Sequence, residues 1–172
     1  MSENFDDPSA NKVLVVDGDE IVLNAFKEQL PPLGFHPTVV NSATLAQEHL
    51  TTEVFAVVII DGNLGGEGMG LLEQARDTQP DCSRIMLASG IGVDDLARVL
   101  ESGLIYRYLT KPWMGNDLHV ALVNAAERYR MIKENEALQN RNMQLSEQMA
   151  TGGGGEEEGG SNVGGEGLAF DA

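Results

Sequence analysis

Short apolar runs rich in valine, isoleucine and leucine recur along the chain, separated by polar segments and turn residues. A continuous apolar run of this length is typical of a strand that is buried on both faces. We therefore predict five strands, at residues 13–16, 36–40, 54–60, 84–88 and 106–109. Pro37 cannot donate a backbone hydrogen bond, so the second of these strands is expected at an edge of the sheet.

Between the predicted strands, apolar residues recur at the spacing of an amphipathic helix. Pro31 follows the first of these segments, Asn41 or Ser42 can cap the second, and Gly103 can end the fourth. The predicted helices span residues 21–30, 42–51, 69–78 and 93–102. Strands that alternate with helices in this way predict an α/β fold with a doubly wound, five-stranded parallel sheet.

A helical pattern without proline or glycine begins near residue 116 and continues to about residue 150, longer than the sheet requires. Its second part repeats apolar residues at heptad spacing. Asparagine occurs at two of the alternate seam positions, a pattern that fixes register and favours parallel dimers. The seam residues are Met131, Leu138, Leu145, Asn135, Asn142 and Met149. We predict a parallel coiled-coil homodimer through residues 131–150, with a single solvated helix as the alternative.

The charge of the chain is strongly negative and unevenly distributed, with 27 acidic against 11 basic residues and a net charge of −16. Residues 151–172 contain nine of the 20 glycines and five acids without a base, which predicts a disordered tail. The acidic residues 1–11 are also expected to be disordered, which places the globular domain at residues 12–130. The negative charge opposes contact with nucleic acid or with an anionic membrane surface.

The remaining composition narrows the class of protein further. The chain has one cysteine, which excludes a disulfide framework and a thiolate zinc cluster. The longest apolar run, residues 54–60, is too short to span a bilayer, and the N-terminus lacks the apolar core of a secretory signal. We therefore expect a cytoplasmic protein that is not embedded in a membrane.

Charged residues follow three of the predicted strands: Asp17 the first, Asp61 the third and Lys111 the fifth. Because the carboxyl ends of parallel strands meet at one edge of a sheet, these side chains are expected to lie together. Two neighbouring carboxylates favour a divalent cation such as Mg²⁺, and a carboxylate beside Mg²⁺ and an ammonium group can attack a phosphoryl donor. Since no nucleotide-binding glycine motif follows any strand, the pattern favours phosphoryl transfer onto the protein itself.

The segments that carry these residues, VLVVDGDE, VVIID and YRYLTKPW, resemble the receiver domain of two-component response regulators. The resemblance covers about residues 12–130 and implies a flavodoxin-like (CheY-like) fold with strand order 2-1-3-4-5, here with an extended C-terminal helix. It implies that Asp61 is the phosphoacceptor and that Lys111 contacts the phosphoryl group. It also implies that Tyr108 is the switch aromatic of the output face and that the bond between Lys111 and Pro112 is cis.

The resemblance further implies a Mg²⁺ site formed by Asp17, Asp61 and the backbone of Asn63. Receivers usually carry two adjacent acids after the first strand, but here the second position is Gly18. Asp19 is a candidate substitute as a metal ligand, although it does not match the family pattern by position. Weak binding of Mg²⁺ is therefore expected.

Two further positions depart from the family pattern. The hydroxyl residue that ordinarily ends the fourth strand is Ala88 here, and Ser89 follows one residue later as the candidate hydroxyl contact. The loop after the phosphoacceptor has Gly65 where the family usually has proline, which should make the loop more mobile.

The sequence is compatible with two functions. The first is a non-enzymatic response regulator that accepts a phosphoryl group from a histidine kinase or phosphotransfer protein and signals through protein contacts. The alternative is a degenerate receiver that serves as a dimerisation or scaffold module without phosphorylation. A flavin-binding flavodoxin shares the sheet order, but the acidic segment after the first strand has the wrong charge for a flavin phosphate.

Overall fold

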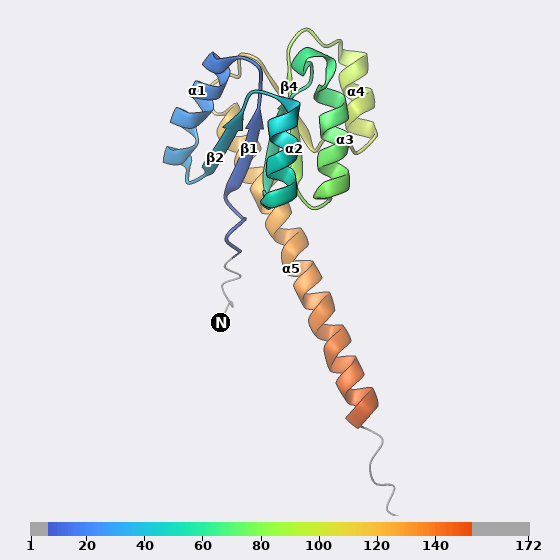
Figure 1. The fold of residues 1–172 in the computed structure, drawn as a ribbon. Helices are drawn as coiled ribbons and strands as arrows, with labels where there is room; N and C mark the ends of the chain where they lie inside the picture. Colours follow the sequence, from blue (N-terminus) through green and yellow to red (C-terminus); the bar gives the residue numbers. More distant parts are fainter. Residues whose placement is uncertain (1–6, 153–172) are drawn as a thin grey trace, which may run out of the picture. The chain divides into compact units, whose positions relative to one another are not determined.

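The computed structural model describes residues 7–152, which contain five strands and five α-helices (Figure 1). The strands are β1 (Lys12–Val16), β2 (His36–Val40), β3 (Val57–Asp61), β4 (Ser83–Ala88) and β5 (Arg107–Thr110). The helices are α1 (Glu20–Gln29), α2 (Ala43–Thr52), α3 (Gly68–Thr78), α4 (Val93–Glu101) and α5 (Asp117–Gly152), and short 3₁₀ turns occupy Pro31–Leu33 and Leu64–Gly66.

All four strand pairings are parallel, and the strand order is β2-β1-β3-β4-β5. This confirms the predicted doubly wound sheet and its order. The strand that contains Pro37 lies at an edge, where a missing backbone donor leaves no gap in the ladder. The carboxyl ends of β1 and β3 are adjacent at the centre of the sheet, which is where charged residues were expected to meet.

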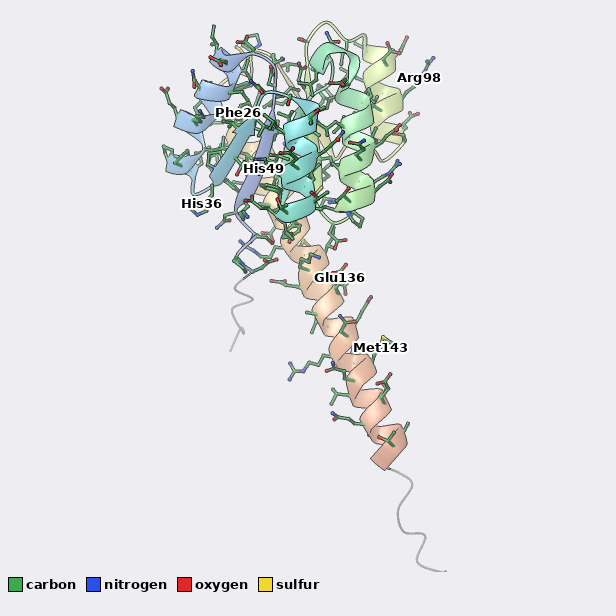
Figure 2. All side chains as sticks on the ribbon, in the orientation of Figure 1. Phe26, His36, His49, Arg98, Glu136 and Met143 are labelled. Atoms are coloured by element: carbon green, nitrogen blue, oxygen red, sulfur yellow. The ribbon has the colours of Figure 1, made fainter. Side chains whose placement is uncertain are left out.

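The helices bury two apolar layers against the two faces of the sheet. On one face α1 and α5 pack against β1, β3 and β4, and the Phe26 side chain is fully buried there (Figure 2). On the other face α2 and α3 supply the buried side chains. Helix α4 buries no residue, and only its partly buried Leu96 and Val99 pack against the second layer.

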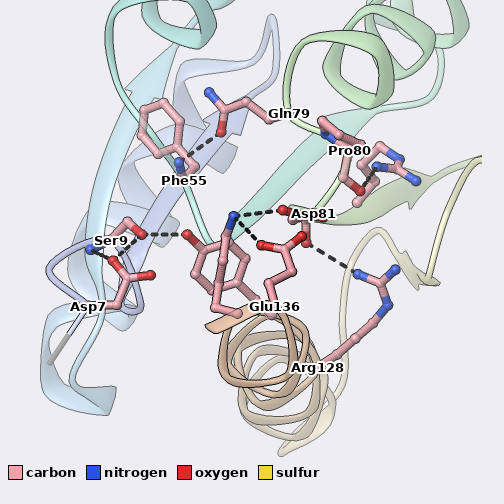
Figure 3. A network of polar contacts seen from close by, with 11 residues as sticks. Asp7, Ser9, Phe55, Gln79, Pro80, Asp81, Arg128 and Glu136 are labelled. Carbon is pink, nitrogen blue, oxygen red and sulfur yellow. Dashed lines mark hydrogen bonds and ion pairs between the residues drawn. The ribbon is translucent and has the colours of Figure 1, made fainter. Parts of the chain in front are cut away.

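The third strand begins later than predicted. Val54 is 52% exposed, and the backbone N–H of Phe55 donates to Gln79 Oε1 at 2.9 Å rather than to a neighbouring strand (Figure 3). The amide nitrogen of Gln79 in turn donates to the carbonyl oxygens of Leu50 and Glu53. The Gln79 side chain therefore replaces strand pairing where α2, α3 and β3 meet.

The chain forms a compact unit up to Glu136, beyond the boundary predicted at residue 130, and a second unit begins at Ala137. Residues 7–11, which were expected to be disordered, instead form a turn in which Ser9 and Ala10 are buried. Ser9 is held because its hydroxyl lies 2.6 Å from the Tyr129 hydroxyl of α5.

Helix α5 continues two residues past the predicted end, to Gly152. Its residues from Ala137 onward carry exposed apolar side chains, among them Leu138, Leu145 and Met143, the last of which is labelled in Figure 2. No helix within residues 7–152 is long and apolar enough to cross a membrane. The tail predicted at residues 151–172 lies outside the described residues, apart from its first two.

Candidate functional site

The charged residues at the carboxyl ends of the strands meet around one cavity of about 510 Å³. Asp17 follows β1, Asp61 ends β3 and Lys111 follows β5, and all three line the cavity. The sequence prediction that these three side chains gather at one sheet edge is confirmed by this arrangement. We call this the acid cavity.

The ammonium group of Lys111 lies between the two carboxylates. Its Nζ is 2.8 Å from Asp17 Oδ2 and 3.5 Å from Asp61 Oδ1. Burial alone would lower the pKa of Lys111, but the hydrogen bond to Asp17 and the charges of both acids raise it above its usual value. The group is therefore cationic at neutral pH, and one positive charge is shared by two carboxylates.

Both carboxylate oxygens of Asp61 accept backbone hydrogen bonds from the loop that follows β3. The N–H of Asn63 donates to Oδ1 and the N–H of Leu64 donates to Oδ2, each at 3.2 Å. Leu64 has a φ of 33°, unusual for a residue other than glycine, and its side chain is buried in the core. Gly65 and Gly66 continue in the left-handed region, where glycine has no steric penalty. The loop therefore directs two amides at the carboxylate.

The other acids after β1 have different tasks. Asp17 is 1% exposed, and its Oδ1 accepts the backbone N–H of Asp19 at 2.9 Å. Asp19 is the N-cap of α1, because its Oδ1 accepts the N–H of Ile21. Gly18 has an ordinary φ, and a Cβ built on it meets no atom within 4 Å. The position where the family usually has an acid is therefore open to a side chain without a steric clash.

The oxygen atoms at the cavity suit Mg²⁺ only in part. The carboxylates of Asp17 and Asp61 and the carbonyl of Asn63 are hard oxygen donors, and Mg²⁺ can be held by two carboxylates while it keeps several waters. The Asn63 carbonyl already accepts the N–H of Gly66 at 2.6 Å. No group of three acidic, histidine or cysteine side chains that could hold a metal occurs within residues 7–152. The donor set fits the ion, but with one carboxylate fewer than a fully acidic site.

Ser89, and not Ala88, lines the acid cavity. Ala88 is buried at the end of β4, and its carbonyl accepts the backbone N–H of Lys111 at 2.9 Å. The hydroxyl that the sequence placed one residue late thus comes from the loop directly after the strand, on the same side as Asp61.

Tyr108 lies away from the acid cavity. It is 39% exposed on β5 and lines a separate cavity of about 570 Å³ together with Asn116, Asp117 and Val120 of the next segment. The peptide bond between Lys111 and Pro112 is cis, as the resemblance implied. The next residue, Trp113, packs its ring 4.6 Å from that of Phe26, so it acts as a packing residue.

Four residues at the acid cavity were not identified from the sequence. Asn41 and Ser42 line it after β2, and Leu64 and Glu67 line it from the loop after Asp61. Asn41 and Ser42 directly follow a predicted strand, which could have marked them as cavity residues, but the sequence pattern predicted only a helix cap there. Glu67 had no signal beyond its position in a glycine-rich loop.

Comparison with known proteins gives a match to the family model of the response regulator receiver domain over residues 13–123. Among curated proteins, the chain is 30% identical over 125 residues to the hydrogenase transcriptional regulatory protein HoxA of Bradyrhizobium diazoefficiens. It is 28% identical over 126 residues to a putative NtrX-like response regulator of Rickettsia conorii. In both cases the match covers 72% of this chain but only 26% of the relative.

Solved structures show the same similarity. The signal receiver domain of an HD domain-containing protein from Pseudomonas fluorescens is 31% identical, with a TM-score of 0.66 over 72% of this chain and 91% of that one. The structure described as the adenylate cyclase from Rhodopirellula baltica is 25% identical, with a TM-score of 0.71 over 76% of this chain and 97% of that one.

Proposed function

The chain belongs to the response regulator receiver domain family, and on this premise we propose that it is a two-component response regulator that accepts a phosphoryl group on Asp61. The observation that carries the proposal is the acid cavity. There Asp61 ends a central strand with the Lys111 ammonium 3.5 Å away and two backbone amides directed at its oxygens. The donor would be a phosphohistidine on a histidine kinase or phosphotransfer protein.

In the proposed transfer a carboxylate oxygen of Asp61 forms a bond to phosphorus while the phosphorus–nitrogen bond of the donor breaks. The imidazole nitrogen leaves with the electron pair. Lys111 would neutralise charge on the transferred oxygens, and Ser89 is the candidate hydroxyl that contacts them. Asp17, Asp61 and the Asn63 carbonyl would hold Mg²⁺, and Asp19, whose Oδ1 caps α1, is a further candidate ligand. When bound, the ion supplies further positive charge to the phosphoryl oxygens.

The output would be a change in protein contacts and not catalysis or DNA binding. We propose a parallel homodimer through the seam at residues 131–150, whose Leu138 and Leu145 are exposed at 58% and 51%. The curated relatives include transcriptional regulators, but the chain spans about a quarter of their length. Its net charge of −16 argues against DNA contact by this segment itself and fits a cytoplasmic partner protein.

A second candidate function is a scaffold that dimerises without phosphorylation. Gly18 favours it, because the site lacks the acid that receivers usually place there. In that case Asp61→Asn would leave both the oligomeric state and partner binding unchanged. The phosphoacceptor function instead requires that the substitution change both of them.

The test is intact-mass spectrometry of the full chain after incubation with acetyl phosphate and Mg²⁺. We expect a phosphoryl adduct on Asp61 in the native protein and its loss in Asp61→Asn. Asp77→Asn, at a 71% exposed side chain outside the acid cavity, should retain the adduct. Absence of the adduct in folded native protein would reject Asp61 as the phosphoacceptor.

A further inference from the structure

Helix α5 holds the loop before β4 through one residue, Asp81, at the end of the sheet opposite the acid cavity (Figure 3). The Asp81 carboxylate accepts from Lys133 Nζ at 2.6 Å, and the Asp81 backbone carbonyl accepts from Arg128 at 3.5 Å. Lys133 also pairs with Glu136 at 3.4 Å. The helix therefore contacts the side chain and the backbone of the same loop residue.

The first residue of β4 is also held by α5, in part through the same Arg128. Ser83 is fully buried, and its hydroxyl donates to the Ala125 carbonyl at 2.8 Å and accepts from Arg128 at 3.2 Å. Loss of a partner for a buried hydroxyl is costly, so this attachment resists displacement of the strand relative to the helix.

Arg128 also contacts the segment that leads into β5. Its guanidinium carbon lies 5.5 Å from the centroid of the Tyr106 ring, within the range of a cation–π interaction. The backbone N–H of Tyr106 donates to the Arg84 carbonyl of β4 at 2.7 Å. One side chain of α5 thus contacts both β4 and the residue before β5.

The opposite ends of these two strands carry residues of the acid cavity. Ser89 follows β4 and Lys111 follows β5, and the strands are paired in register from Ile85 with Arg107 to Ala88 with Thr110. Strand β4 is also paired with β3, which ends in Asp61, so Asp61, Ser89 and Lys111 lie at the carboxyl end of one hydrogen-bonded ladder. A displacement of Ser89 or Lys111 toward a phosphoryl group would be transmitted along β4 or β5 and would change the contacts that Arg128 makes at the other end.

We infer that Arg128 couples the occupied state of the acid cavity to helix α5, through its contacts with Asp81, Ser83 and Tyr106. Arg128 is a positioning residue in this scheme, since it is remote from the reacting atoms. The inference rests on the proposed function, because it needs a phosphoryl group or its mimic to bind at Asp61.

The test uses the full chain with beryllofluoride and Mg²⁺ and two separate readouts. Fluorine NMR measures bound beryllofluoride, and hydrogen–deuterium exchange measures the opening of α5 at residues 137–150. We expect beryllofluoride to change α5 exchange on the order of five-fold in the native protein, a typical size for coupling between sites. Arg128→Met and Tyr106→Leu should remove that change while beryllofluoride still binds.

Two matched variants separate coupling from general disturbance. Arg130→Met removes an arginine of the same helix that forms an ion pair with Glu127 at 3.9 Å, and Tyr106→Phe keeps the aromatic ring. Both should respond like the native protein. A full α5 response in Arg128→Met and Tyr106→Leu would overturn the coupling and leave the proposed function intact. Absence of beryllofluoride binding in the native protein would overturn both.

Discussion

The two ends of the parallel sheet both contain aspartate–lysine pairs, but the balance of charge differs. At the acid cavity one ammonium group, Lys111, serves two carboxylates, Asp17 and Asp61. At the opposite end, which we call the base, Lys133 pairs with Asp81 at 2.6 Å and with Glu136 at 3.4 Å, and Arg128 adds a second cation beside Asp81. The excess negative charge at the cavity can bind a cation or take part in phosphoryl transfer, whereas the acidic and basic side chains at the base balance each other.

The loops at the two ends of the sheet also differ, in their backbone conformation and hydrogen bonding. Next to Asp61 the backbone takes left-handed conformations at Leu64, Gly65 and Gly66. At the base, Gln79 joins three segments with ordinary hydrogen bonds. Strained backbone and unbalanced charge cost stability and are typical of functional sites, so we infer that the base stabilises the fold that the cavity end uses.

The largest effect that tests this comparison is expected from Gln79→Leu. The substitution leaves the N–H of Phe55 and the carbonyls of Leu50 and Glu53 without their partner. We expect the free energy of unfolding to fall by about 3 kcal/mol, measured by chemical denaturation. Gln74→Leu, at an exposed position of α3, the helix that Gln79 follows, is the control and should change it little. Equal losses of unfolding free energy in the two variants would mean that the Gln79 hydrogen bonds at the base do not stabilise the fold.

The next largest effect is expected from Gly18→Asp at the acid cavity. A Cβ at this position has free space, and the added carboxylate lies beside Asp17, so the affinity for Mg²⁺ should rise roughly ten-fold. Calorimetric titration of the full chain with Mg²⁺ measures this.

Gly70→Asp is the matched control, because it adds the same charge at an open helical position that does not line the cavity. We expect no gain in Mg²⁺ affinity there. A similar gain in both variants would mean that overall charge, and not a ligand at position 18, sets the affinity.

The features that the sequence predicted well depend on local pattern. The apolar runs predicted all five strands and their parallel order followed from the alternation with helices. Gly103 adopts a φ of 75° after α4, which only its missing side chain makes easy. Asp17, Asp61 and Lys111 were found because each directly follows or ends a strand.

The features that the sequence missed depend on distant contacts. Val54 belongs to an apolar run, but the backbone N–H of Phe55 donates to the Gln79 side chain instead of to a neighbouring strand, so the strand begins after Val54. Phe55 and Gln79 are 24 residues apart in sequence. The Asp81–Lys133 pair spans 52 residues. Neither partner has a spacing that marks it. Similarly, the choice between Ala88 and Ser89 depends on how β4 ends in space.

A smaller effect is expected from Lys133→Met at the base. The Asp81–Lys133 pair is partly exposed, at 27% for each side chain, so its loss should cost about 1 kcal/mol in the free energy of unfolding. Arg130→Met, whose ion pair with Glu127 is longer and more exposed, should cost less. Denaturant titration of both variants at neutral pH makes the comparison. If the two costs were equal, the direct pairing at the base would contribute nothing of its own.

The smallest effect is the pH dependence of that contribution. The hydrogen bond from Lys133 lowers the pKa of Asp81 below its usual 3.8, and the hydrogen bond to Asp81 raises the pKa of Lys133 above its usual 10.5. A lowered acid pKa stabilises the fold above pH 3.8 and the benefit is lost as the pH falls through the folded-state value. A raised lysine pKa stabilises it below pH 10.5 and the benefit is lost as the pH rises further.

The difference in unfolding free energy between the native protein and Lys133→Met should therefore be constant between these limits and shrink outside them. Unfolding measured at a series of pH values tests this, and the comparison of two variants cancels the contribution of Lys111, whose pKa is also raised. A difference that persists unchanged well below pH 3.8 would mean that Lys133 stabilises the base through packing against the Tyr129 ring, 5.7 Å away, and not through the Asp81 charge.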